Sequence, residues 1–225
     1  MNQAVEQDGF AIIPETIPLK TIVSLSDALE QARPTRKGAG IRNVLRIPAI
    51  RSFAEEARLS GIAKAVLGDG AVPFRATLFD KSSGLNWLVV WHQDTALPLR
   101  EKRSVPGWGP WSVKQGVTCA RAPAAALEQV LAVRVHLDDS SETNGPLRVL
   151  PATHKLGVLI DKQIQNLTRT NEATECLVGV GGVLLMRPLL VHASSKAKLD
   201  APRRVLHIEY ASGLCCGKGL ELAVD

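Results

Sequence analysis

The spacing of apolar residues divides the chain into a helical first third and a strand-rich remainder. In residues 18–32 and 49–67 apolar positions recur every three or four residues, which predicts two helical regions. Pro34 after the first region and Gly68-Asp69-Gly70 after the second are typical stop signals. Residues 35–47, between the two regions, are expected to form a basic, glycine-containing loop.

Short apolar or alternating runs, bounded by Gly, Pro, Asn and Asp, predict strands in the rest of the chain. The predicted strands are residues 9–14, 72–80, 86–91, 129–138, 147–150, 174–180 and 182–186. Many short strands after a helical start favour a mainly β fold, a jelly roll with flanking helices packed outside it. The sequence has no internal repeat, and its 225 residues suit a single domain over residues 1–225.

The segment of residues 95–128 does not fit this pattern. It carries four prolines, many charged residues and two tryptophans, Trp108 and Trp111. A loop of this length in a compact domain usually has a function, and tryptophans are rare in disordered chain. We interpret the segment as a lid loop over a functional site.

Composition indicates a soluble globular protein, with 45% apolar and 22% charged residues. No run of 18 apolar residues predicts a membrane span, and the first residues lack the basic and apolar parts of a secretion signal. The four cysteines have no CxxC spacing, so we expect reduced thiols in a cytoplasmic protein and no cysteine-based zinc site.

The net charge of +5 is spread along the chain. Its basic clusters lack the interleaved aromatic residues of single-strand binders, so we expect no nucleic-acid partner. An anionic small molecule, as substrate or cosubstrate, fits the charge better. Nothing in the sequence determines an oligomeric state.

The candidate chemistry begins at the end of the apolar run Trp87–Trp91, where His92 and Asp94 follow two positions apart. Residues i and i+2 of a strand share a face, so one imidazole and one carboxylate can meet at one point. They are two of the three ligands of the 2-His-1-carboxylate triad that holds non-haem Fe(II). A second His-x-Asp, His136 and Asp138, has the same spacing, and spacing alone does not separate the two pairs.

Two later stretches can complete such a site. The apolar run Gly181–Arg187 leads, after a proline, to His192 and Ser194. The predicted strand from Arg203 to Tyr210 begins with two guanidinium groups, and arginine binds a carboxylate with two parallel hydrogen bonds. By alternation Arg203 shares a face with His207 and Glu209, whereas Arg204 shares one with apolar residues, which favours Arg203 as the anchor.

With these residues the chain resembles the phytanoyl-CoA dioxygenase family of Fe(II)/2-oxoglutarate-dependent oxygenases. The resemblance covers roughly residues 8–212, and the distance of 11 residues from His192 to Arg203 matches the family pattern. Where the family usually has Gly-Ser-His, this chain has Ala152-Thr153-His154, a departure that concerns only a turn. The matching residues are His92-Gln93-Asp94, Asn144 to His154, His192 with Ser194, and Arg203.

The resemblance implies a double-stranded β-helix, cupin-like core and a specific set of site residues. It implies that His92, Asp94 and His192 bind Fe(II), that Arg203 binds the distal carboxylate of 2-oxoglutarate, and that Ser194 assists Arg203. It also favours His92 and Asp94 over the second His-x-Asp pair. Because the carboxylate of Asp94 is present, halogenation is not expected, since related halogenating enzymes have a small residue there.

The activity implied is hydroxylation of an unactivated C–H bond of a small organic substrate, with O2 consumed and succinate and CO2 released. We expect Trp108, Trp111 and Arg134 to be substrate-binding residues, although both tryptophans have an equally good interpretation as core anchors of the lid loop. Two alternatives stay open: a jelly-roll metal enzyme that does not use 2-oxoglutarate, and a non-catalytic jelly-roll binding protein. The substrate itself does not follow from the sequence.

Overall fold

The structure is a computed structural model that describes residues 1–32, 40–81, 86–199 and 201–225. Its strands are β1 (Phe10–Ile13), β2 (Gly40–Arg42), β3 (Val72–Asp80), β4 (Val89–His92), β5 (Ala96–Pro98), β6 (Trp111–Lys114), β7 (Val117–Arg121), β8 (Val130–His136), β9 (Leu147–Val149), β10 (Thr174–Cys176), β11 (Val183–Met186), β12 (His192–Ser194) and β13 (Arg204–Ala211). Its helices are α1 (Asn2–Asp8), α2 (Leu19–Gln31), α3 (Pro48–Glu55), α4 (Ala57–Leu67), α5 (Ala124–Leu127) and α6 (Asp161–Thr170), with short 3-10 turns at Val44–Arg46 and Thr153–Leu156. None of the helices in these ranges is both long enough and apolar enough to span a bilayer.

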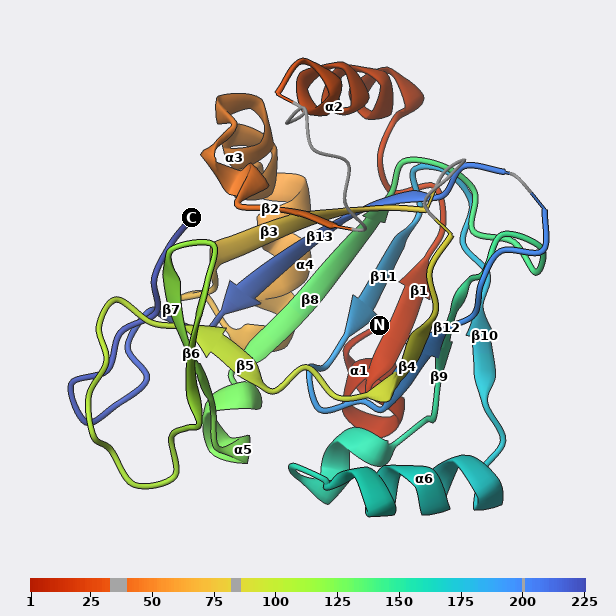
Figure 1. Ribbon diagram of the computed structural model, residues 1–225. Helices are drawn as coiled ribbons and strands as arrows, with labels where there is room; N and C mark the ends of the chain where they lie inside the picture. Colours follow the sequence, from red (N-terminus) through yellow and green to blue (C-terminus); the bar gives the residue numbers. More distant parts are fainter. Residues whose placement is uncertain (33–39, 82–85, 200) are drawn as a thin grey trace.

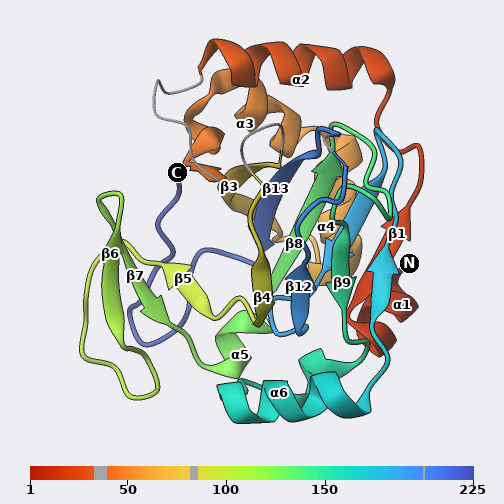
Figure 2. The same cartoon turned by 45° about the vertical axis from the view of Figure 1, so that its right-hand side comes forward.

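Two antiparallel sheets form the core of the fold. The larger has the strand order β1-β11-β8-β13-β3-β2 and the smaller the order β10-β9-β12-β4. The smaller sheet lies in front of the larger one in Figure 2. Helices α2, α3 and α4 share an apolar core with the larger sheet, and in Figure 1 α4 lies behind this sheet while α2 and α3 lie above it. The predicted fold class is confirmed: a mainly β jelly roll with flanking helices.

The larger sheet separates an apolar layer from a polar one because its central strands alternate. On β8, Leu131, Val133 and Val135 belong to the apolar core that is shared with the helices. The residues between them include Arg134 and His136, which are buried on the opposite face. That opposite face looks toward the smaller sheet, so the space between the sheets carries polar groups.

Part of the space between the sheets is nevertheless packed with apolar side chains. Ala132 of β8, Leu184 and Met186 of β11, and Leu147 and Val149 of β9 form a buried cluster there. The polar groups are therefore confined to the remaining part of this space, which we call the lumen. It is lined by side chains of β3, β8 and β13 on one side and by side chains of β4 and β12 on the other.

Several element predictions are confirmed and others need correction. The predicted helix over residues 49–67 is two helices, because Glu56 between them has an extended backbone with ψ 143°. Of the predicted loop over residues 35–47, residues 35–39 lie outside the described residues, and the rest contains β2 and a 3-10 turn. Helices α1 and α6 were not predicted, since each buries a single side chain, Val5 and Ile164 respectively, and so leaves little apolar periodicity.

The lid segment, residues 95–128, is not a loop without secondary structure. It contains β5, β6 and β7, which form a third sheet, and α5. Backbone hydrogen bonds tie it to the C-terminal segment, from Arg100 N to Glu221 O at 3.0 Å and from Ala223 N to Pro98 O at 3.1 Å. These strands were not predicted from the sequence, because they are short and lie among prolines and charged residues. Their partners lie in the segment itself and at the chain end.

Candidate metal centre

His92, Asp94 and His192 come together at the rim of the lumen. One ligand atom from each lies within 4.8 Å of the others, and they are the one such group of three found among the described residues. His92 Nε2 lies 3.6 Å from Asp94 Oδ1, and His192 Nε2 lies 3.7 Å from Asp94 Oδ2. Two imidazole nitrogens and a carboxylate at this spacing suit a metal ion that keeps open coordination positions.

The two histidines meet because β4 and β12 are antiparallel neighbours with His92 and His192 in register. Their ring centroids lie 4.3 Å apart. Asp94 lies two residues beyond the end of β4, and its position is fixed by a hydrogen bond from its backbone N–H to Pro188 O at 2.9 Å. The residue that turns the chain before His192 therefore also holds Asp94.

Backbone carbonyls orient both imidazole rings. His92 Nδ1 lies 2.8 Å from Val90 O, and His192 Nδ1 lies 2.8 Å from Leu190 O. A carbonyl only accepts, so each Nδ1 carries a proton, and each Nε2 is the nitrogen that faces Asp94. Metal-binding histidines are commonly held in this way, with the nitrogen that does not bind the metal donating to a carbonyl.

The charges at this cluster favour an ionised carboxylate and a neutral His192. Burial opposes ionisation of Asp94, but His192 and the other imidazoles around it hold the pKa of the Asp94 carboxyl below its usual range. Burial lowers the pKa of His192 to about 4. A metal ion needs both of these states, since protons compete with it for the same atoms.

The second His-x-Asp pair is used differently. Asp138 accepts hydrogen bonds from Arg204 Nε at 2.9 Å, Arg204 Nη2 at 2.8 Å and the backbone N–H of Arg204 at 2.8 Å. His136 faces the lumen, and burial lowers its pKa to about 3. Asp138 and His136 thus do not converge on one point.

Arg203 lies in the lumen, with only 4% of its surface exposed. Its Nη2 donates to Ser194 Oγ at 3.3 Å and its Nε to Asn144 O at 3.2 Å. Lys81 Nζ donates to the same Ser194 Oγ at 2.9 Å. Burial, and then the charge of Arg203, lower the pKa of Lys81 to about 8. We call Lys81, Ser194 and Arg203 the anion cradle, because no described carboxylate pairs with either cation.

Gly145 allows the anion cradle to close. Its φ is +69°, and a Cβ there would lie 2.3 Å from Ser195 O and 3.1 Å from Lys81 Nζ. Ser194 Oγ also donates to Gly145 O at 2.9 Å. A glycine is therefore needed here both for the positive φ and for the close approach of the backbone to Ser195 and Lys81.

Two further lumen-facing groups on β8 have buried atoms without a hydrogen-bond partner: Arg134 Nε and His136 Nδ1. Buried polar atoms are almost always paired, so unpaired atoms on a lumen wall suit a polar ligand. Arg134 Nη1 lies 2.9 Å from His207 Nδ1. Arg134 is therefore inside the lumen, whereas its predicted role in substrate binding stays a prediction.

The tryptophans of the lid segment lie elsewhere. Trp108 and Trp111 are partly buried against an apolar cluster that includes Leu97, Leu127 and Leu222. Trp108 also lines a pocket of about 420 Å³ shared with Cys215 and Cys216 of the C-terminal segment. Neither lines the pocket that contains His92, and a substrate role for them stays a prediction.

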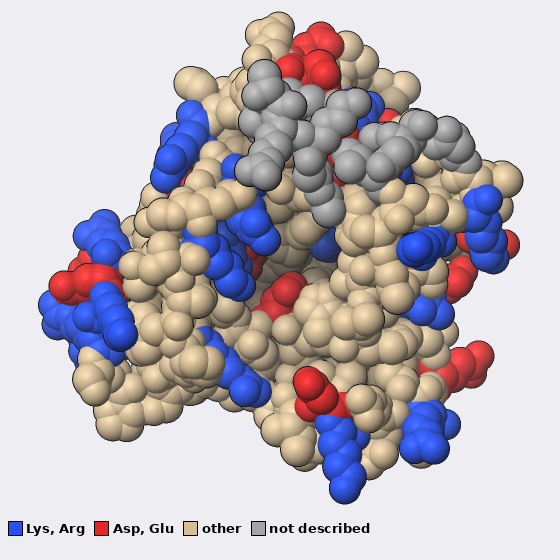
Figure 3. Space-filling view, viewed as in Figure 1, with Lys and Arg blue, Asp and Glu red and all other residues tan. Residues whose placement is uncertain are grey.

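The pocket beside His92 has a volume of about 360 Å³. It is lined by Gln93 and Thr95, by Arg121 of the lid segment, and by residues 159–161 and Ile164 at the start of α6. The face of the molecule drawn in Figure 3 is hollowed near its middle, and both basic and acidic side chains line the hollow. Access to the metal centre is thus bordered by charged groups.

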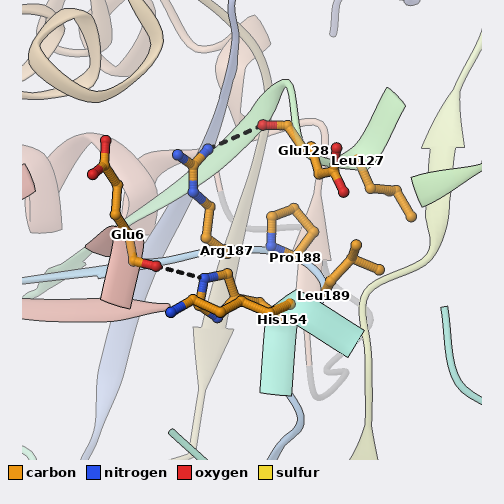
Figure 4. A pocket seen from close by; sticks show the side chains of 8 residues that line it. Glu6, Leu127, Glu128, His154, Arg187, Pro188 and Leu189 are labelled. Atoms are coloured by element: carbon orange, nitrogen blue, oxygen red, sulfur yellow. Dashed lines mark hydrogen bonds between the residues drawn. The ribbon is translucent and has the colours of Figure 1, made fainter. Parts of the chain in front are cut away.

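A third pocket, of about 250 Å³, contains no group of metal ligands among the described residues. Figure 4 shows its lining, in which His154 Nε2 lies 3.2 Å from Glu6 O and Arg187 Nη1 donates to Glu128 O at 3.0 Å. His154 thus contacts helix α1 through a backbone carbonyl.

Gly145 and Arg121 are candidate residues for which the sequence predicts no role in a site, and for Lys81 it predicts no more than a place among the residues that could line one. Lys81 directly follows β3, and its side chain donates to a serine 113 residues away. Arg121 was one of many charges in the lid segment. Its position directly after a predicted strand is the one local signal for Lys81.

A family model described as phytanoyl-CoA dioxygenase (PhyH) matches residues 5–205. No curated protein matches the chain. Among solved structures, AviO1 from Streptomyces viridochromogenes Tue57 is similar with a TM-score of 0.68 and 21% identity, covering 93% of this chain and 92% of that one. EctD from S. alaskensis, solved with 2-oxoglutarate and 5-hydroxyectoine, gives a TM-score of 0.71 and 19% identity over 95% of this chain and 75% of that one.

The epimerase SnoN from nogalamycin biosynthesis, described as non-haem and α-ketoglutarate-dependent, gives a TM-score of 0.70 and 16% identity over 97% of this chain and 85% of that one. At these identities the structural likenesses show the fold. The class of enzyme is shown by the match to the family model, which covers most of the chain.

Proposed function

The chain belongs to the phytanoyl-CoA dioxygenase family, and from that premise we propose that it hydroxylates an unactivated C–H bond of a small organic molecule. Family membership makes it an oxygenase that uses Fe(II), 2-oxoglutarate and O2. In the proposed reaction one oxygen atom of O2 enters the substrate as a hydroxyl group and the other enters succinate, while CO2 is released. The resemblance seen in the sequence and the match to the family model agree on this class.

In this proposal His92, Asp94 and His192 bind the iron. The donor set fits Fe(II), because it offers two neutral nitrogens and one ionised oxygen from three side chains and leaves other positions free. Bound Fe(II) supplies the site at which O2 is activated. The protein's part is to orient the ligands through Val90 O and Leu190 O and to exclude water.

The anion cradle is proposed to hold the distal carboxylate of 2-oxoglutarate. Arg203 provides a charged fork and Lys81 a second charge. The Ser194 hydroxyl, which accepts from both and donates to Gly145 O, holds the two cations side by side. Burial makes each bond from these cations to an anion stronger than it is in water. This cradle is the observation that carries the proposal. A jelly-roll metal enzyme without an acidic cosubstrate, or a binding protein, has no need for two buried cations that lack a carboxylate partner.

The pocket between Arg121 and the start of α6 is proposed as the place where substrate reaches the iron. It borders His92 directly, and Arg121 and Asp161 give it one charge of each sign. A guanidinium at this position favours a substrate with an anionic group, as the basic composition of the lid segment had suggested. We also propose that the protein is located in the cytoplasm.

The experiment that tests the proposal is succinate formation. Purified protein is incubated with Fe(II), ascorbate, O2 and 2-oxoglutarate, with and without candidate substrates, and succinate is quantified. We expect succinate that depends on Fe(II) and is abolished in Asp94→Ala, because that change removes the one carboxylate ligand. Succinate formation that is absent under all these conditions contradicts the proposal.

A further inference from the structure

Arg134 on β8 is a buried cation without an acidic partner. Its side chain is among the buried groups, with 6% of the residue exposed. No described carboxylate lies within salt-bridge distance of its guanidinium, and its Nε has no hydrogen-bond partner. Arginine and lysine are rarely buried without a partner, because the cost of removing the charge from water is not offset.

The guanidinium is held in place by two neighbours. His207 on β13 lies opposite Arg134 in the register, and its Nδ1 is 2.9 Å from Arg134 Nη1. The guanidinium carbon lies 5.5 Å from the centre of the Phe79 ring. Because the guanidinium can only donate, His207 accepts with Nδ1 and is neutral, so it orients Arg134 without neutralising its charge.

Arg134 lies within electrostatic reach of both the metal centre and the anion cradle. Its charge acts on Asp94 and His192 of the metal centre and on Arg203 of the cradle. Along β13, the partner residue His207 follows Arg203 by four positions, about 13 Å of strand at roughly 3.3 Å per residue. The lumen wall thus offers one guanidinium at the cradle and a second one nearer the metal ligands.

We propose that Arg134 binds the carboxylate of 2-oxoglutarate that adjoins its oxo group, while Arg203 binds the distal carboxylate. The inference rests on the proposed function. It follows from charge and position, because a dicarboxylate held at Arg203 and reaching the metal centre brings its second negative end toward Arg134. Arg75, whose charge also acts on Asp94, is already paired with Glu209. The unpaired Nε of Arg134 is then the donor that this carboxylate completes.

This assignment also defines what Arg134 contributes. It fixes the orientation of the 2-oxo acid end against the metal centre, whereas Arg203 selects for a second carboxylate. Removal of the Arg134 side chain should therefore weaken the binding of every 2-oxo acid. Removal of the Arg203 side chain should weaken the binding of only those 2-oxo acids that have a distal carboxylate. The two roles are separable by choosing the ligand.

The test measures ligand binding to the protein loaded with Mn(II) in place of iron, by calorimetry, so that no turnover occurs. The ligands are 2-oxoglutarate and 2-oxopentanoate, which lacks the distal carboxylate. For Arg134→Gln we expect both dissociation constants to rise by about ten- to a hundredfold, as for loss of a hydrogen bond to a charged group. For Arg203→Gln we expect a rise of that size for 2-oxoglutarate and little change for 2-oxopentanoate.

Arg148→Gln is the matched control. Arg148 is also an arginine on a jelly-roll strand, but it points away from the lumen and stacks on Trp91 at 5.2 Å, and its change is expected to leave both affinities unaltered. Arg134→Lys keeps the charge and covers the case in which the glutamine variant does not fold. This variant is expected to raise the dissociation constants of both ligands severalfold, because a lysine cannot reproduce the planar fork of the guanidinium.

Unchanged affinity for both ligands in Arg134→Gln, or in Arg134→Lys if the former is unfolded, overturns the assignment. So does a change confined to the KM of the organic substrate, which would make Arg134 a substrate-binding residue. If the unaltered protein loaded with Mn(II) does not bind 2-oxoglutarate, the proposed function itself fails, which is a different result.

Discussion

Arg204 donates two side-chain hydrogen bonds and one backbone hydrogen bond to the carboxylate of Asp138, at 2.8 to 2.9 Å. This pairing explains two ambiguities of the sequence together. It gives the second His-x-Asp motif a structural partner, and it occupies one of two adjacent arginines. The other, Arg203, is left in the lumen beside Ser194.

The first prediction concerns these two arginines. Arg203→Gln is expected to raise the dissociation constant of 2-oxoglutarate by at least about tenfold, because a charge-assisted hydrogen bond in a buried site is lost. Arg204→Gln is expected to leave that constant unchanged and to lower the thermal unfolding midpoint, because Asp138 loses its partner. Calorimetric titration and thermal unfolding measure the two effects, and equal losses of affinity in both variants would contradict the assignment.

The second prediction separates the two histidines of the His-x-Asp motifs. His92→Ala is expected to weaken Fe(II) binding by at least about a hundredfold, since one of three ligands is removed. His136→Ala is expected to retain Fe(II) binding within a few-fold, because His136 lies apart from the three ligands. Competition with a chelator measures the affinity, and loss of iron from both variants would show that His136 is needed as well.

The third prediction is a dependence of 2-oxoglutarate binding on pH. Burial and Arg203 lower the pKa of Lys81 to about 8, so Lys81 is charged below that pH and loses its proton above it. A carboxylate binds the charged form, so affinity is highest below pH 8 and falls as pH rises through 8. Arg203 does not share this window, because its own pKa is lowered only to about 10.

Titrations between pH 7 and 9.5 test this with Lys81→Gln as the comparison. The variant is expected to bind more weakly at pH 7 and to show no decline that begins near pH 8. A decline of the same size in both proteins would assign the pH dependence to another group.

The fourth prediction uses two glycines with the same φ angle. Gly145 and Gly157 both have φ of +69°, but a Cβ at Gly157 meets nothing within 4 Å, whereas at Gly145 it meets Ser195 O and Lys81 Nζ. Gly157→Ala therefore reports the backbone strain alone, about 1–3 kcal/mol of stability. Gly145→Ala is expected to cost more than that and to weaken 2-oxoglutarate binding as well.

Chemical denaturation and calorimetric titration measure these two quantities. The comparison is informative because a positive φ is common to both positions, whereas the contacts of the added Cβ differ. If Gly145→Ala and Gly157→Ala lose the same stability and both keep their affinity for 2-oxoglutarate, the glycine has no role in the anion cradle.

The sequence by itself determined the class of the protein and the principal elements of the fold. Apolar spacing predicted most strands of the larger sheet, such as β3, β8 and β13, which carry their periodicity locally, but not β2, which lies in the predicted loop. The His-x-Asp motif, His192 and the distance to Arg203 indicated the family, because ligand chemistry restricts residue types and the fold restricts their order. These signals are local, or depend on spacing that can be counted along the chain.

Tertiary structure decided which residues have which partners. His92 and His136 have the same local pattern, and the pairing of β4 with β12 brings His92 next to His192. For the two arginines strand alternation already favours Arg203, and the structure adds the ion pair that gives Arg204 its partner, Asp138. Lys81 and Ser194 are 113 residues apart, and the strands of the lid segment close on the C-terminal segment. Contacts across such distances depend on strand register and burial, which no window of sequence contains.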